Sequence, residues 1–192
     1  MSRIIESIEV DVPIRVAYDQ WTQFESFPEF MEGVDRVVQL DDRTLEWTAT
    51  IAGKTKHWRA EIIEQVPDRV VSWRSTDGAQ NDGHVQFESV APDRTGITVQ
   101  LDVEPEGLVE KAGDALGIVE RRVRGDLERF REFVEGRGEA TGAWRGRVDG
   151  TVVERDDETP GGMSGDSAGA GGSTAGTSVG AGSGTAGSGM RQ

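Results

Sequence analysis

The side chains of this chain best suited to proton transfer are Ser75, Arg59 and His84, and each lies in or beside a segment whose pattern predicts a β-strand. Histidine is the usual general base near neutral pH. However, Arg59 and His84 alternate with apolar neighbours that are predicted to point inward, so both are expected on the solvent side of their strands. Ser75, two residues after Trp73, is expected to point inward. These residues are therefore weak candidates for catalysis.

Other catalytic and metal-binding arrangements cannot be assembled from this sequence. It has no cysteine, and its two histidines are His57 and His84, which argues against a thiolate nucleophile and against cysteine or histidine metal sites. No nucleophile is paired with a base, and no glycine-rich loop has the spacing that binds phosphates. The 35 acidic residues show no spacing that singles out a pair and are expected to form a solvated surface. We therefore expect neither a metal nor a cofactor.

Tryptophan is unusually frequent, with five residues against one tyrosine. Trp47, Trp58 and Trp73 each share the strand period of their apolar neighbours and are predicted to point inward. Indole rings can line an apolar pocket, and their N–H groups can hold a polar group of a ligand. The alternative is that these rings simply fill a core. Phe87 and Leu101 have the same inward phase and are expected in the same wall.

A sheet has to position these side chains. The alternation at residues 3–12 predicts a first strand, and two short helices are predicted near residues 13–21 and 26–31. Apolar runs separated by turn residues then predict strands at 35–40, 44–51, 54–66, 69–75, 83–90 and 96–104. Sequential strands joined by short turns imply an antiparallel meander with one apolar face.

The pattern at residues 107–137 predicts one long helix with a single buried side. The first half of this helix carries small residues such as Gly117, while its second half carries Leu127 and Phe130. A glycine inside a helix costs roughly 1 kcal/mol relative to alanine, so these small residues require either a close backbone contact or space for a ligand. We expect Leu116 and Gly117 to lie beside such a space.

Several of these segments resemble one known family. The features are Pro13 after the first strand, the segment at 24–31, the strand around Trp58, Val66-Pro67 before Val71-Ser72-Trp73, and the helical segment at 126–130. Over residues 2–137 they are similar to the polyketide cyclase/dehydrase and coenzyme Q-binding branch of the START-like (SRPBCC) superfamily. The resemblance implies an α+β helix-grip fold. In this fold a curved antiparallel sheet, with two short helices after strand one, wraps around a long C-terminal helix and encloses a deep apolar cavity.

The resemblance also implies roles for the two short helices and for Ser75. In this fold the short helices close one end of the cavity, with ordinary core packing as the alternative role. The expected gate residues are Trp21, Phe27, Phe30 and Met31. The aromatase/cyclases of the superfamily have an arginine two residues after the serine of a Trp-x-Ser motif. This chain has Asp77 there, which weakens the prediction of cyclase activity.

The overall charge limits the partners. A net charge of −14 and a pI of about 4.6 disfavour binding to nucleic acid and to anionic lipid surfaces. The N-terminus lacks a basic segment followed by an apolar run, and no segment has the ~18 apolar residues that span a bilayer. We therefore expect a cytoplasmic protein without an integral membrane segment, and an uncharged ligand is compatible with its charge.

The composition of the chain changes near residue 138. Residues 1–138 are predicted to form one START-like helix-grip domain. Residues 139–192 are predicted to form a Gly/Ser/Ala-rich tail that is disordered, because it has too few apolar residues to offset its ordering entropy. A small island around Trp144 could contact the domain or add an edge strand.

The leading functional hypothesis is a protein that binds a hydrophobic small molecule in an internal cavity without catalysis. Lipids, prenylated quinones and polyketide-like aromatics all fit this description. The first alternative is a polyketide cyclase or dehydratase that uses Ser75, Arg59 or His84 for proton transfer. The second is an accessory interaction protein that uses Trp144 and the tail. The predicted ligand-binding residues are Trp21, Phe27, Phe30, Met31, Trp47, Trp58, Trp73, Phe87, Leu101, Leu116 and Gly117.

Overall fold

The computed structural model describes residues 2–51, 53–103 and 112–155, apart from the side chains at 51, 103 and 112–116. Its elements in chain order are β1 (Ser2–Val10), α1 (Ile14–Trp21), the 3-10 helix η1 (Phe24–Glu29), β2 (Val34–Gln39), β3 (Thr44–Ile51), β4 (Lys54–Val66), β5 (Val70–Gly78), β6 (Asn81–Ala91), β7 (Arg94–Val103), α2 (Ala112–Arg137), β8 (Arg147–Asp149) and β9 (Val152–Glu154). The predicted order of strand, two short helices, six strands and long helix is confirmed, with β8 and β9 added after it.

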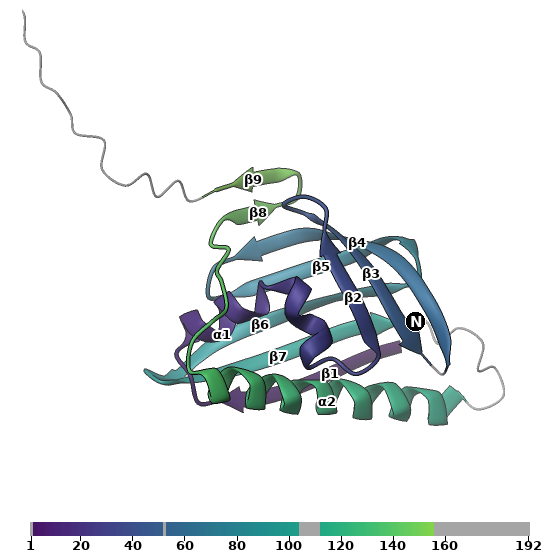
Figure 1. Cartoon of the computed structure of the whole chain (residues 1–192), viewed down its shortest axis with the longest axis horizontal. Helices are drawn as coiled ribbons and strands as arrows, with labels where there is room; N and C mark the ends of the chain where they lie inside the picture. The colour runs from purple at the N-terminus through teal and green to yellow at the C-terminus, as the bar shows by residue number, and fades with distance from the viewer. Residues whose placement is uncertain (1, 52, 104–111, 156–192) are drawn as a thin grey trace, which may run out of the picture. The chain divides into compact units, whose positions relative to one another are not determined.

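The strands form one antiparallel sheet. Its main path runs β1-β7-β6-β5-β4-β3-β2, so β2 to β7 form a meander and β1 closes beside the last strand of that meander. The register of β4 against β5 shifts after Arg59 and again after Ile62, and such bulges bend a strand. Figure 1 shows the sheet curving around α1 and η1, while α2 runs along β1. The predicted helix-grip fold is therefore confirmed.

The main core lies between the inner face of the sheet and the second half of α2. Leu127, Phe130 and Val134 of α2 are buried there. The Phe130 ring meets Trp21 of α1 edge-on, with 5.0 Å between ring centroids, and meets Phe30 at 5.2 Å. Such edge-to-face contacts add to the free energy gained by burying the rings. The bulky half of the predicted helix pattern thus fills one end of the curved sheet.

The loop between η1 and β2 is fixed to α2 by hydrogen bonds to its main chain. The Arg129 Nε donates to the carbonyl of Phe30 at 2.8 Å, and Arg122 donates to the carbonyl of Glu32. The Asp126 carboxylate accepts the N–H of Glu32 at 2.8 Å and also pairs with Arg129. Side chains of α2 therefore satisfy main-chain groups that have no strand partner in this loop.

Residues 139–155 extend the compact unit past the predicted boundary. β8 pairs with β4, with Gln65 opposite Val148, and Trp144 packs against the main core. The described residues of the compact unit thus continue past residue 138 as far as residue 155. Strands of three residues are too short to show a period, so the sequence pattern could not define them. The predicted disorder of the remaining tail, residues 156–192, lies outside the described residues.

An arginine attaches this C-terminal segment to α1. The Arg145 guanidinium lies 2.7 Å from a carboxylate oxygen of Asp19 and 2.6 Å from one of Asp68. Hydrogen bonding to Asp68 raises the pKa of Arg145. The Gln20 Oε1 accepts the N–H of Thr141 at 2.9 Å, which adds a second attachment. The last described segment is thus held to the first helix by charge and by hydrogen bonds.

Asp126 and Asp41 are expected to affect the pH dependence of stability in opposite directions. Burial raises the pKa of Asp126, so the folded state holds the carboxyl proton of Asp126 more tightly than the unfolded state does. The contribution of Asp126 to stability is therefore lost as pH rises above the usual aspartate range. The N–H groups of Arg43 and Thr44 lower the pKa of Asp41, so its contribution is lost as pH falls through that range.

Urea unfolding from about pH 4 to pH 7 tests this contrast with Asp126→Asn and Asp41→Asn. The free energy of unfolding of the wild type, minus that of the variant, should decrease with pH for Asp126→Asn and increase for Asp41→Asn. Slopes of the same sign for both variants would contradict this assignment.

Arg145→Ala is expected to lower the free energy of unfolding by about 2 to 4 kcal/mol, because it leaves Asp19 and Asp68 without their main partner. Arg147→Ala is the matched control, since the Arg147 side chain is 53% exposed and its Asp149 partner is 4.0 Å away. The control should change stability by no more than about 0.5 kcal/mol. Equal urea midpoints for the two variants would show that Arg145 does not hold the segment.

Candidate functional site

Three tryptophans gather on the inner face of β3, β4 and β5. Trp47 and Trp58 are directly opposite in the register of β3 and β4, and their rings are stacked, with centroids 5.6 Å apart and 10° between the planes. Trp58 is 6% exposed and packs with the buried Ala49 and Ala60. Trp47, Trp73 and Ala79 pack against this group and are partly buried. We call these six residues the tryptophan cluster.

The tryptophan cluster adjoins the main core, because Trp47 and Trp73 pack against both groups. Among the described side chains, α2 contributes to the main core from Val123 onward, and none of its residues belongs to the tryptophan cluster. A Cβ placed on Gly117 of α2 would meet no described atom within 4 Å. The Leu116 side chain lies outside the described part. None of the described side chains of α2 therefore belongs to the tryptophan cluster, whereas Phe27 of η1 packs against its Trp47.

A glycine widens this aromatic surface toward β7. In the register of the sheet, Gly83 lies between Trp73 of β5 and Leu101 of β7. A Cβ on Gly83 would lie 2.8 Å from Cζ2 of Trp73 and 2.8 Å from Cδ2 of Leu101, so only a glycine lets both side chains close over β6. The role of Gly83 depends on the pairing of β5, β6 and β7, so no local pattern in the sequence predicts it.

The structure divides the remaining predicted ligand-binding residues between the cluster and the main core. Phe27 of η1 connects the two, since its ring lies 5.7 Å from the Trp47 ring and 5.6 Å from the Trp21 ring. Trp21, Phe30 and Phe87 are buried in the main core, and Met31 is partly buried against it. The contacts recorded for these four residues are packing contacts within or against the main core.

The three weak catalytic candidates are not brought together. Arg59 is 54% exposed and pairs with Glu46 at 3.2 Å on the outer face of the sheet. His84 lies between Gly83 and the buried Val85, and strand alternation turns it to that outer face. The Ser75 Oγ accepts the N–H of Asn81 at 2.8 Å. The Asp82 carboxylate accepts the main-chain N–H of Ser75 at 2.8 Å, so the acidic group recorded beside Ser75 is Asp82. Neither Arg59 nor His84 shares the inner face with Ser75.

Sequence reasoning missed a charged residue on the inner face of β1. Glu6 has the strand parity of the buried Ile4 and Val10, and its side chain is 10% exposed. Arg124 of α2 donates to both carboxylate oxygens of Glu6, at 3.1 and 2.7 Å. The alternation of residues along β1 was the sequence signal that could have placed Glu6 on the inner face. This pair joins β1 to α2 close to the point where the packed half of the helix begins.

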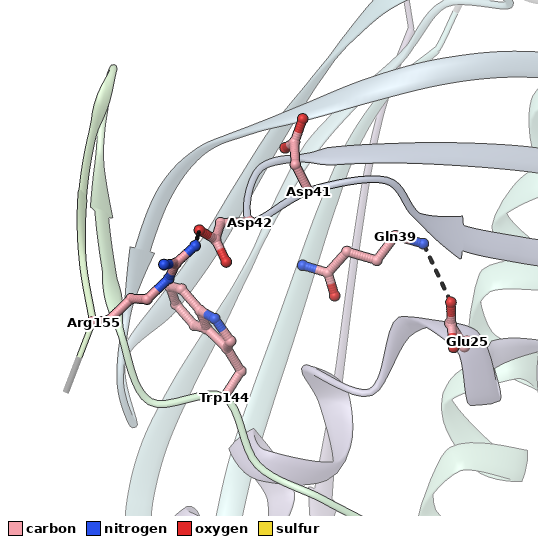
Figure 2. Close-up of a pocket in the computed structure, with 6 residues that line it drawn as sticks. All are labelled: Glu25, Gln39, Asp41, Asp42, Trp144 and Arg155. Atoms are coloured by element: carbon pink, nitrogen blue, oxygen red, sulfur yellow. Dashed lines mark hydrogen bonds and ion pairs between the residues drawn. The ribbon is translucent and has the colours of Figure 1, made fainter. Parts of the chain in front are cut away.

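A pocket of about 380 Å³ lies on another part of the surface, where the end of β2 and η1 meet the C-terminal segment. Figure 2 shows the residues that line it, which are Glu25, Gln39, Asp41, Asp42, Trp144 and Arg155. Asp42 already pairs with Arg155, and Asp41 accepts main-chain N–H groups. Because these polar groups are bonded within the chain, this pocket is a weaker candidate than the tryptophan cluster.

Two kinds of feature are absent from the described residues, a metal-binding group and a membrane-spanning helix. Among the residues that the structure describes, no group of three or more histidine or acidic side chains is placed to hold a metal ion. Across the same ranges, none of the helices combines the length and the apolar character needed to cross a membrane.

Comparisons with known proteins identify one matching family and one relative of high sequence identity. The profile of the family described as polyketide cyclase / dehydrase and lipid transport matches residues 10–131. An uncharacterized 17.2 kDa protein of Streptomyces lincolnensis is 48% identical over 149 residues, which cover 77% of this chain and 99% of that protein.

Solved structures share the fold. An aromatase/cyclase of a Streptomyces species is 15% identical, with a TM-score of 0.61 over 74% of this chain and 98% of its own. A START superfamily protein of Mycobacterium smegmatis is 17% identical, with a TM-score of 0.57 over 70% of this chain and 95% of its own. At these identities the likeness concerns the fold.

Proposed function

This chain belongs to the polyketide cyclase/dehydrase and lipid transport family, and from this premise we propose that it binds a hydrophobic small molecule on the inner face of its sheet without transforming it. The ligand class includes lipids, prenylated quinones and polyketide-like aromatics. The tryptophan cluster is the observation that carries the proposal. It is an apolar, aromatic group on the inner face of the sheet, and none of its members comes from the described side chains of α2.

The energetics support binding without a charge on the ligand. Burying ~300 Å² of apolar ligand surface at about 25 cal/mol/Å² gives roughly 7 kcal/mol before the costs of association are subtracted. Stacked indole rings suit a flat or extended apolar molecule, because they offer wide faces with few rotatable bonds. Affinity in the useful range therefore requires no ion pair with the ligand.

The positions of the catalytic candidates favour binding over catalysis. Arg59 and His84 lie on the outer face of the sheet, so neither can reach a molecule on the inner face near Trp58. The Ser75 Oγ accepts the N–H of Asn81 at 2.8 Å, while the nearby Asp82 carboxylate accepts the main-chain N–H of Ser75 at 2.8 Å and is thereby engaged by the main chain. General acid–base catalysis needs a group within hydrogen-bond reach of the reacting atom.

A cyclase or dehydratase acting on an aromatic polyketide intermediate is the second candidate. It is favoured by the inward position of Ser75, whose hydroxyl accepts one hydrogen bond and keeps its own proton to donate. Ser75→Ala separates the two functions. With a poly-β-ketone as substrate, a noncatalytic protein gives the spontaneous products at the uncatalysed rate in wild type and variant alike. A product of the wild type that Ser75→Ala loses would instead establish the enzyme.

Trp58→Ala is expected to weaken binding of the apolar fluorescent probe N-phenylnaphthylamine by about tenfold or more, because it removes one ring of the stacked pair. Fluorescence titration measures the affinity, and urea unfolding of the same samples gives the folded fraction. Trp144→Ala is the matched control, since Trp144 lies outside the tryptophan cluster.

Trp58→Phe provides a milder variant in case Trp58→Ala does not fold. The proposal is contradicted if the folded Trp58 variants bind the probe as tightly as Trp144→Ala does. It is also contradicted if the wild type does not bind the probe.

A further inference from the structure

Two polar atoms, one in the tryptophan cluster and one at the start of β6, are buried without a hydrogen-bond partner. They are Nε1 of Trp47, which can only donate, and Oδ1 of Asn81, which can only accept. A buried polar group without a partner costs about 1 to 3 kcal/mol, so most such groups in proteins are paired. The other two such atoms belong to Tyr18 and Gln65, which face each other in the main core.

The register places Asn81 on the same face as the tryptophan cluster. Asn81 is two residues before Gly83 on β6, so their side-chain directions are the same. At Gly83 that direction leads to the side chains of Trp73 and Leu101. The N–H of Asn81 is held at 2.8 Å by Ser75, a residue whose β5 position is opposite Ala60 of the cluster. The start of β6 is therefore fixed beside the aromatic surface.

Trp47 is held just as firmly. Its ring lies between Trp58, on which it stacks at 5.6 Å, and Phe27, at 5.7 Å. With aromatic neighbours on two sides, the indole cannot easily rotate to find a partner for its N–H within the chain. A donor on β3 and an acceptor on β6 are thus both fixed and both unpaired.

We propose that Trp47 and Asn81 select the ligand, an inference that rests on the proposed binding function. The preferred ligand is an apolar, ring-containing molecule that carries both an oxygen acceptor for Trp47 Nε1 and a hydroxyl donor for Asn81 Oδ1. Hydrocarbons leave both protein atoms unpaired. Quinones and ethers without a hydroxyl leave Asn81 unpaired, because an acceptor cannot satisfy another acceptor. A hydroxyl-bearing carbonyl compound pairs both atoms.

Four naphthalene derivatives of similar size test this selection by displacement of N-phenylnaphthylamine. They are an acetylnaphthol with its substituents at opposite ends of the rings, its methyl ether, the isopropylnaphthol of the same shape, and the dimethylnaphthalene. Wild type should bind the acetylnaphthol about threefold to tenfold more tightly than its methyl ether and than the isopropylnaphthol, as expected for one hydrogen bond each.

Two variants assign these preferences to residues. Asn81→Leu should abolish the preference for the acetylnaphthol over its methyl ether, and Trp47→Phe should abolish the preference for the acetylnaphthol over the isopropylnaphthol. The affinity of each variant for dimethylnaphthalene is measured in parallel, so that each preference is compared after any general loss of apolar binding has been accounted for. Gln86→Leu removes an amide from the exposed face of the same strand, and Trp144→Phe makes the same ring change elsewhere, so both controls should behave as wild type.

The outcomes separate this inference from the binding function. If wild type binds all four compounds with equal affinity, the inner face binds apolar molecules but the selection by Trp47 and Asn81 is wrong. If the preferences exist but survive in both variants, other residues select the ligand and the inference is again wrong. If none of the four compounds displaces the probe, the proposed site itself is wrong and the inference fails with it.

Discussion

The structure depends on the packing of the second half of α2, which supplies the buried residues among the described side chains of this helix. Its second half inserts Leu127, Phe130 and Val134 into a core of aromatic rings from α1 and η1. Interiors packed at this density do not deform continuously, so these contacts fix the position and tilt of the whole helix. The first half can then carry small residues such as Gly117 without a loss of alignment.

Polar contacts strengthen this one-sided attachment. Arg122, Asp126 and Arg129 bind the main chain of the loop before β2, and Arg124 binds Glu6 on the inner face of β1. These four residues lie between positions 122 and 129, in the central turns of α2, where the apolar packing also begins. Hydrogen bonds to charged groups contribute more than neutral ones, which suits a helix that is packed over only part of its length.

The same division underlies the proposed binding site. A fully packed sheet face would have no surface to offer, and an uncovered aromatic face would favour aggregation. Here the strands carry a second apolar group, the tryptophan cluster, beside the packed core and connected to it through Phe27. The catalytic candidates Arg59 and His84 are on the opposite face, where they cannot contact a molecule beside Trp58.

The sequence by itself determined the order of elements, the inward phase of Trp47, Trp58 and Trp73, and the change from small to bulky residues along α2. These features are local, because strand and helix periods can be read from neighbouring residues. The tertiary structure alone decided which distant residues contact one another. The gap that Gly83 leaves for Trp73 and Leu101, the unpaired Asn81 Oδ1 and the attachment of residues 139–155 by Arg145 each depend on contacts between distant segments. Strand pairing and charge pairing across such distances leave no period in the sequence, so they could not be predicted from it.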